Sequence, residues 1–157
     1  NAFSNFATMP AQQNETLNVV QVVQMTLEIF NEDYITFSAI EDEIIAKLDR
    51  TQLIRVVTNL VKNAIQAIPE EQENKQVFVT VFREDHQVKI AVKDNGKGIS
   101  EDNAARIFEP KFTTKSSGMG LGLAIIKNII ENYQGTITFE TEINIGTEFL
   151  VSFPINK

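Results

Sequence analysis

The strongest constraint on the fold is a run of apolar residues spaced three and four positions apart between residues 53 and 68. Its members are Leu53, Val56, Val57, Leu60, Val61, Ala64, Ile65 and Ile68. This spacing predicts one long amphipathic helix, whose apolar stripe needs a second layer to cover it. Asp49 precedes the helix and Gln52 follows three residues later, which is the pattern of a capping box. Pro69 ends the helix.

Segments that alternate apolar and polar residues could form the second layer. Residues 77–81 and 88–92 alternate in this way around a short polar turn, which predicts a hairpin. Further strands are expected at residues 35–40, 43–48, 136–142 and 147–153, and further helices at 17–30, 100–107 and 121–133. The sequence therefore predicts an α+β protein. We expect a two-layer α/β sandwich, with a mostly antiparallel mixed sheet and three main helices on one face.

Composition limits the kinds of site that the chain can hold. Among the 157 residues there is no Cys, which excludes disulfides, a thiol nucleophile and a thiolate metal site. The net charge of −7 argues against nucleic acid as a partner. It also means that any phosphate must be held by local N–H groups, Lys and a cation. No apolar run is long enough to span a bilayer and no signal peptide is visible. We expect a cytoplasmic location, which is compatible with a longer parent protein that is anchored in a membrane.

The first 16 residues differ in pattern from the rest. Phe3, Phe6 and Met9 recur at intervals of three, as in the last turns of a helix that Pro10 ends. Residues 11–16 are polar and are predicted to be a linker. We therefore expect two parts, residues 1–16 as a helix end and linker and residues 17–157 as the domain proper.

Two amides lie on the long helix. Asn59 and Asn63 are four residues apart, so they share one side of the helix, beside the apolar stripe. An amide oxygen is a hard ligand that suits Mg²⁺, which takes few protein ligands. The alternative is a pair of ordinary surface amides.

A short glycine motif ends the second strand of the hairpin. Asp94, Gly96 and Gly98 stand at alternate positions. Glycine allows a flat ligand to approach the backbone closely, and a carboxylate can accept a hydrogen bond from an exocyclic amine such as that of adenine. A turn rich in Asp and Asn is the alternative.

A second glycine motif, Gly118, Gly120 and Gly122, precedes the helix expected at 121–133. Exposed N–H groups at a helix start suit phosphates, although neither a P-loop nor a Rossmann fingerprint fits; a ligand-free hinge is the alternative. The polar segment 109–119 before this helix is predicted to be a lid that is disordered or variable without nucleotide, or else a solvated loop. It offers Phe108 and Phe112 as anchors and Lys111 and Lys115 as cations.

In this order and spacing, the four segments closely resemble the N, G1, F and G2 boxes of the histidine-kinase catalytic and ATP-binding domain. That domain belongs to the GHKL superfamily, which has the Bergerat fold. The resemblance covers residues 17–155. Residues 3–10 are similar to the end of the second dimerisation helix that precedes such domains, and Gly146-Thr147 is similar to the family's last strand, where the Thr lies near the base.

The resemblance implies roles for individual residues. Asn63 would hold Mg²⁺, Asn59 would help to position the phosphates, and Asp94 would bind the adenine amine. Lys115 would contact the phosphates and, with the two Asn residues, act in catalysis. The other nucleotide-binding residues implied are Gly96, Gly98, Ile99, Phe108, Lys111, Thr114, Gly118, Gly120, Leu121, Gly122, Leu123 and Thr147.

The implied function is transfer of the γ-phosphoryl group of ATP, with Mg²⁺, to a histidine on dimerisation helices outside this chain. A response regulator would be a partner of the full-length protein, and the isolated domain is expected to be monomeric. Two positions depart from the family's patterns: Gln66 stands where many members have Lys or Arg, and Asn59 stands where the ATP-hydrolysing relatives have a Glu base. His86, in the predicted hairpin turn, is not expected to be the acceptor.

Two alternative functions remain open: a nucleotide-binding regulatory module without kinase activity, and an anti-sigma-type serine kinase of the same fold.

Overall fold

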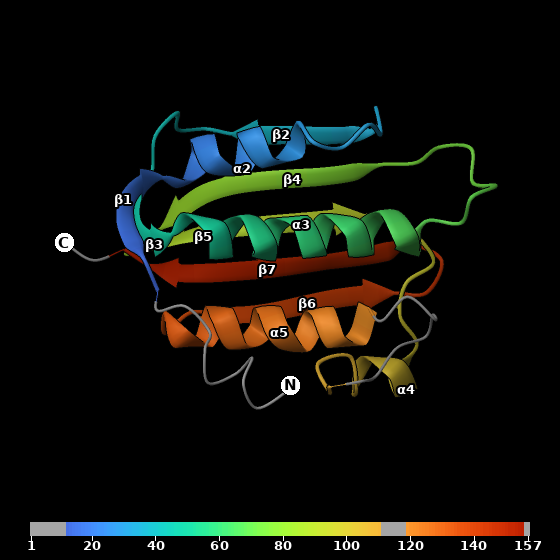
Figure 1. Cartoon of the computed structure of the whole chain (residues 1–157). Coiled ribbons are helices and arrows are strands. Elements are labelled where there is room, and N and C mark those ends of the chain that lie inside the picture. The colour runs from blue at the N-terminus through green and yellow to red at the C-terminus, as the bar shows by residue number, and fades with distance from the viewer. Residues whose placement is uncertain (1–11, 111–118, 156–157) are drawn as a thin grey trace.

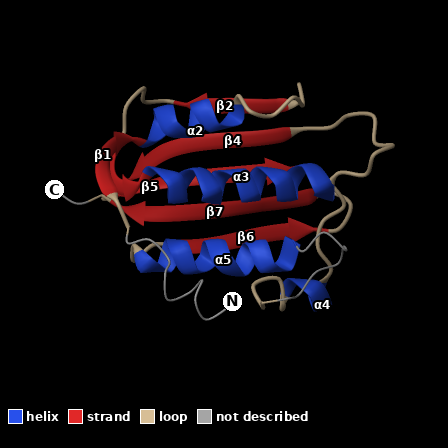
Figure 2. Ribbon diagram, in the orientation of Figure 1, coloured by secondary structure: helices blue, strands red, loops and turns tan. Residues whose placement is uncertain are grey.

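The protein is described by a computed structural model over residues 12–110 and 119–155. Figures 1 and 2 show the chain as a layer of helices in front of a layer of strands. The elements are β1 (Asn14–Asn18), α2 (Val19–Leu27), β2 (Ile35–Ala39), β3 (Ile45–Asp49), α3 (Arg50–Ala67), β4 (Val77–Glu84), β5 (Gln87–Asp94), α4 (Glu101–Ala104), α5 (Met119–Asn132), β6 (Thr136–Glu142) and β7 (Gly146–Pro154).

The main sheet has five strands in the order β2-β4-β5-β7-β6. The β2–β4 pair is parallel and the other three pairs are antiparallel. Helices α2, α3 and α5 cover one face of this sheet (Figure 2). The expected two-layer α+β sandwich with a mostly antiparallel mixed sheet is confirmed. A second sheet, of β1 and β3 alone, lies beside it.

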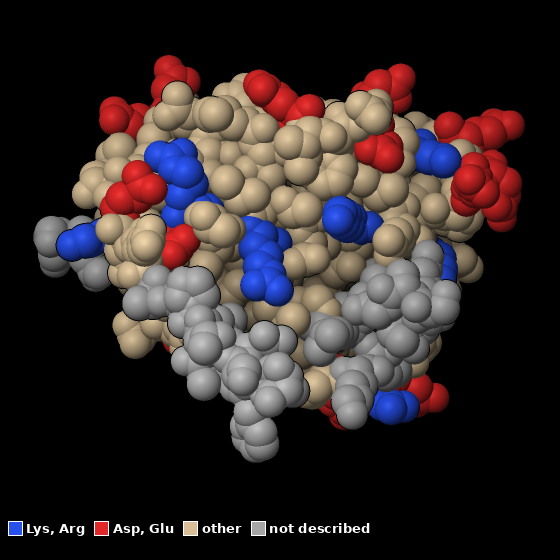
Figure 3. Space-filling view, viewed as in Figure 1, with Lys and Arg blue, Asp and Glu red and all other residues tan. Residues whose placement is uncertain are grey.

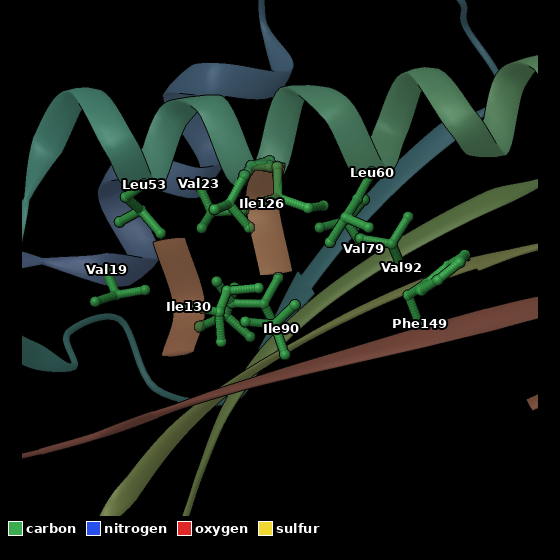
Figure 4. Close-up of a cluster of buried hydrophobic side chains, with 14 of the residues drawn as sticks. Val19, Val23, Leu53, Leu60, Val79, Ile90, Val92, Ile126, Ile130 and Phe149 are labelled. Carbon is green, nitrogen blue, oxygen red and sulfur yellow. The ribbon is translucent and has the colours of Figure 1, made fainter. Parts of the chain in front are cut away.

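The core lies between α3 and the covered face of the sheet. Leu60 of α3 points toward Val79 of β4 and Val92 of β5 (Figure 4), and all three are almost fully buried. Burial of each such side chain contributes roughly 1.5–3 kcal/mol relative to exposure. This packing fixes the rotation of α3, and with it the side on which Asn59 and Asn63 lie.

The helix end expected before Pro10 lies outside the described residues, but the structure differs from the expectation at the end of the predicted linker and at the start of the predicted 17–30 helix. Residues 14–18 form β1, which pairs antiparallel with β3, and α2 runs only from Val19 to Leu27 rather than over residues 17–30. Leu17 fits the helical spacing, but it also fits the alternation of a strand, and it is buried there. The Asn18 side chain decides the boundary, since it accepts a hydrogen bond from the N–H of Val20 at 3.1 Å and so caps α2.

The capping box of α3 is only half formed. As expected, Asp49 Oδ1 accepts from the N–H of Gln52 at 3.2 Å. The N–H of Asp49, however, donates to the hydroxyl of Tyr133 at 3.1 Å, and the buried Gln52 Oε1 has no partner within the described ranges. The Tyr133 hydroxyl in turn donates to Asn14 Oδ1 at 2.7 Å. A residue after the end of α5 thus takes the place expected for the glutamine.

Candidate functional site

The end of β5, the end of α3 and the β6–β7 turn converge on the first glycine motif. The N–H of Lys97 donates to the carbonyl of Ala67 at 2.9 Å, and the carbonyl of Lys97 accepts from the N–H of Asn144 at 2.8 Å. Asp94 is the last residue of β5 and pairs with Thr147 of β7. The structure therefore brings Asp94, Gly96, Gly98 and Thr147 together.

Asp94 is a buried carboxylate, only 5% exposed. Its Oδ1 accepts from the N–H of Gly96 at 2.8 Å. Burial raises the pKa of Asp94 to about 6, although the hydrogen bonds from the backbone of Gly96 and Thr147 act in the opposite direction. At neutral pH the Asp94 carboxylate is ionised but has little contact with water. It can also accept more hydrogen bonds than these two. It is suited to accept a hydrogen bond from a ligand amine.

The glycines of this region are required by close backbone contacts. A Cβ on Gly96 would lie 2.3 Å from the carbonyl oxygen of Ala67, and one on Gly146 would lie 2.0 Å from the carbonyl oxygen of Asp94. Gly98 has a φ of +77°, and its Cβ would lie 2.4 Å from the carbonyl oxygen of Glu142. Only glycine permits the chain to pack this tightly around the carboxylate.

Gly98→Ala should therefore destabilise the domain, by about 1–3 kcal/mol, because it combines a strained φ with a clash against backbone. Gly122→Ala is the matched control. Its Cβ would meet Asn59 Oδ1 at 3.5 Å, which is ordinary contact, and alanine favours a helix by about 1 kcal/mol over glycine. Thermal unfolding of both variants measures the difference. Equal melting temperatures would mean that the turn relaxes freely.

Thr141 is a site residue that the sequence analysis missed. Its Oγ1 accepts from the N–H of Ile99 at 2.9 Å and lies 2.8 Å from Oγ1 of Thr147. It ties the half-buried Ile99, which follows the glycine motif, to the buried Thr147. A Thr on an expected strand carries no sequence signal for this role.

The two amides of α3 lie where the helical spacing placed them. Asn63 is 9% exposed and Asn59 is half-buried, and neither side chain has a hydrogen-bond partner within the described ranges. The start of α5 runs beside them, since Gly122 approaches Asn59 Oδ1. Leu123, the next residue, is buried in the core. Gly120 and Leu121 belong to α5, of which only the backbone is described there.

These amides fit the ligand chemistry of Mg²⁺. The described residues contain no group of three or more His, Cys, Asp or Glu side chains that could hold a metal. A cage made of protein carboxylates is therefore not present in this part of the chain. An ion that keeps its waters and takes an amide oxygen and ligand phosphates is compatible with Asn63.

Phe108 lies at the base of the expected lid. Its ring packs edge-on against Phe139 of β6, with centroids 5.9 Å apart, and Lys127 Nζ lies 5.1 Å from the Phe108 centroid. The expected helix at 100–107 is shorter: α4 runs from Glu101 to Ala104, and Ser100 is its N-cap. Residues 111–118, and with them most of the expected lid, lie outside the described residues; they include Lys111, Phe112, Thr114, Lys115 and Gly118.

His86 stands, as expected, in the exposed turn between β4 and β5, where its carbonyl accepts from the N–H of Ile155 at 2.7 Å.

Over the described part of the chain, no helix combines the length and apolar character needed to cross a membrane.

The fold and this cluster of residues define the protein as a two-layer α+β domain with a buried carboxylate among tight glycine turns. The chain belongs to the family of histidine kinase-, DNA gyrase B- and HSP90-like ATPases, whose sequence model matches residues 48–157. The resemblance seen in the motifs is thereby confirmed.

The chain is similar to parts of bacterial sensor kinases. It is 41% identical over 121 residues to sporulation kinase A of Bacillus subtilis (77% of this chain, 20% of the relative). It is 43% identical over 108 residues to the sensor histidine kinase ZraS of Escherichia coli K12 (69% and 23%). The chain thus spans about a fifth of the length of these relatives.

Solved structures agree with this family. The catalytic domain of histidine kinase ThkA matches with a TM-score of 0.81 and 30% identity, over 92% of this chain and 97% of that one. ThkA in complex with the response regulator TrrA matches with a TM-score of 0.80 and 26% identity, over 99% and 46%.

Proposed function

We propose that this chain is the catalytic and ATP-binding domain of a sensor histidine kinase. The observation that carries the proposal is the buried carboxylate of Asp94, packed between glycine turns in a domain that superposes on a histidine kinase catalytic domain with a TM-score of 0.81. The dimerisation helices of the parent protein would supply the acceptor histidine, and a response regulator would receive the phosphoryl group from it.

In the proposed complex, Asp94 accepts a hydrogen bond from the exocyclic amine of adenine, and the Thr147 hydroxyl lies beside the base. Three supports hold this arrangement: the Gly96 N–H, the tight turn at Gly98, and the Thr141 hydroxyl that links Ile99 to Thr147. Because Asp94 is already bonded on one side and desolvated, binding requires little rearrangement of the pocket.

The phosphates would lie toward α3 and the start of α5. Asn63 would hold Mg²⁺, which neutralises phosphate charge, and Asn59 would orient the phosphates. Lys111 and Lys115 of the lid, and the glycines at positions 118, 120 and 122, would complete the contacts. Such a site acts mainly by positioning and by charge neutralisation.

In the reaction, an imidazole nitrogen of the acceptor histidine attacks the γ-phosphorus of ATP. A nitrogen–phosphorus bond forms, the bond between the γ-phosphorus and its bridging oxygen breaks, and ADP leaves. The acceptor is itself the nucleophile, so the domain needs no nucleophile of its own. Asn59 is an amide and cannot act as the base that activates water, which favours transfer over hydrolysis.

The test is incubation with γ-labelled ATP, with and without the dimerisation helices of the parent protein. We expect acid-labile label on a histidine of those helices, and neither self-labelling nor rapid hydrolysis by the chain alone. Transfer in trans should be slow, because a tether normally raises the acceptor to a local concentration in the roughly millimolar range. His86→Ala should change nothing.

Other outcomes separate the alternative functions. Acid-stable label on a protein partner would indicate a serine kinase. Nucleotide binding without any transfer would indicate a regulatory module.

A further inference from the structure

The outer edge of β2 is unpaired. β2 is the end strand of the main sheet, and within the described residues it pairs only with β4 (Figure 1). The carbonyl of Tyr34 bonds to the N–H of Val77 at 3.1 Å, and alternate residues of a strand direct their backbone groups to the same side. The N–H and C=O groups of Ile35, Phe37 and Ala39 therefore point away from β4. They form the pattern to which another strand can add.

A groove runs beside this edge, between β2 and α2. It has a volume of about 650 Å³ and lies away from Asp94 and the glycine motifs. Its lining includes Val20, Gln21 and Gln24 of α2 and Phe37 and Ala39 of β2. Phe37 and Ala39 thus have backbone groups that face the open edge, and together with Ser38 they contribute to the lining of the groove. A strand added to β2 would direct every second side chain into this space.

The charge of the chain is concentrated around the same edge. Residues 12–46 contain no Lys, Arg or His and seven acidic residues: Glu15, Glu28, Glu32, Asp33, Glu41, Asp42 and Glu43. The other 14 acidic residues of the chain are balanced by its 14 Lys and Arg residues, so the net charge of −7 comes from this one segment. Figure 3 shows Asp and Glu side chains along the upper rim of the molecule, above the position of α2 and β2 in Figure 1.

Among the described residues, two of these seven carboxylates form ion pairs. Glu15 pairs with Arg50 at 3.3 Å and Glu41 with Arg83 at 3.4 Å, and both pairs are exposed to solvent. Exposed pairs contribute little. Of the remaining carboxylates, Glu32 and Asp33 shortly precede β2, Asp42 and Glu43 shortly follow it, and Glu28 follows the last residue of α2; Asp42 also lines the groove. Such an edge favours a cationic partner and repels a second copy of this chain, whose β2 edge carries the same charge.

We propose that the β2 edge and the α2–β2 groove bind an extended, basic segment of a partner protein by strand addition. Its backbone would pair with Ile35, Phe37 and Ala39, its apolar side chains would enter the groove at every second position, and its Lys or Arg side chains would meet the acidic residues at both ends of β2. The surface is separate from the nucleotide site, so this inference does not depend on the proposed function.

The probe is a synthetic peptide of about ten residues in which Lys and Val alternate, titrated into the isotope-labelled chain and followed by NMR. We expect amide shifts centred on Ile35–Ala39 and slower hydrogen exchange at the outward N–H groups. A peptide of the same composition, with its Lys and Val in two separate blocks, should bind about tenfold more weakly because it cannot place apolar side chains at alternate positions. A Glu–Val peptide should not bind.

Two variants locate the binding. Ala39→Pro removes one outward N–H and is tolerated on an edge strand; it should weaken binding of the Lys–Val peptide about tenfold while ADP affinity stays unchanged. Asp42→Lys with Glu43→Lys should weaken binding to a similar extent, about tenfold. The matched control, Glu70→Lys with Glu71→Lys, changes the net charge equally at exposed positions after α3 and should leave binding within about twofold.

Several results would overturn the proposal: no binding at millimolar peptide, amide shifts that fall elsewhere, equal affinity for the alternating and block peptides, or full affinity in Ala39→Pro with ADP binding intact. Self-association of the chain through this edge would also overturn it.

Discussion

Asp94→Asn should weaken ADP binding about 10- to 150-fold, on the order of 1.5–3 kcal/mol, and at the same time stabilise the nucleotide-free domain at neutral pH. The amide keeps the size of the carboxyl group, but it offers a donor or a weaker acceptor to the adenine amine. In the free protein the same change removes a buried charge that burial destabilises, since the pKa of Asp94 is raised to about 6 from its usual 3.8.

The pH dependence follows from this raised pKa. Above about pH 6 the ionised Asp94 lowers the free energy of unfolding, on the order of 3 kcal/mol for a shift of about two units. As the pH falls from 6 through 3.8, the folded state takes up the proton first, so this destabilisation disappears. ADP affinity of the unsubstituted protein should fall over the same range, because the protonated carboxyl is a poorer acceptor.

Calorimetric titration measures the affinity for ADP, and thermal unfolding measures the stability of the free domain. Both are carried out at about pH 7.5 and about pH 5, on either side of the raised pKa of about 6. Asp85→Asn is the matched control. Asp85 is exposed in the β4–β5 turn with a φ of +57°, a conformation that Asn also tolerates. An Asp94→Asn variant with unchanged ADP affinity would remove the adenine assignment.

Asn63→Ala should reduce phosphoryl transfer to the dimerisation helices at least about 100-fold and weaken binding of ATP with Mg²⁺. The physical reason is that the proposed metal site takes few protein ligands, so the loss of one amide oxygen leaves the phosphates poorly neutralised. The fold should be retained, because Ala is a better helix former than Asn and the Asn63 amide has no hydrogen-bond partner in the described part of the chain.

Single-turnover transfer and thermal unfolding are measured side by side for this variant. Asn128→Ala makes the same change at an exposed position of α5 and should leave both quantities near those of the parent. If the Asn63→Ala domain unfolds instead, the residue has a structural role and the metal assignment fails.

The sequence predicts an element correctly where the spacing of its apolar residues fits only one kind of secondary structure. The apolar stripe of α3 fits only a helix, and the alternation in β4 and β5 fits only strands. Asp94 is predictable because its carboxylate and the two glycines that follow stand at alternate positions, 94, 96 and 98. β1 was missed because Leu17 fits both periodicities, and its pairing with β3 depends on residues about 30 positions away.

Contacts between distant segments could not be predicted in the same way. The link from Thr141 to Ile99 spans 42 residues, and nothing local distinguishes this Thr from its neighbours. The segment without basic residues is visible in the sequence. That this segment borders an unpaired edge is visible only in the structure, since the strand order places β2 at the end of the sheet.

The link between Asn14, Tyr133 and Asp49 has a consequence for local unfolding. The first strand, the N-cap of α3 and the segment after α5 share one chain of hydrogen bonds, which the N–H of Gln13 extends by donating to Asp49 Oδ2 at 2.8 Å. When β1 detaches, the Tyr133 hydroxyl loses its acceptor and the N-cap loses a donor from Gln13. Asn14 and Tyr133 are 119 residues apart in the sequence. We therefore expect these segments to open together, and the first turn of α3 to become less protected from hydrogen exchange when β1 detaches.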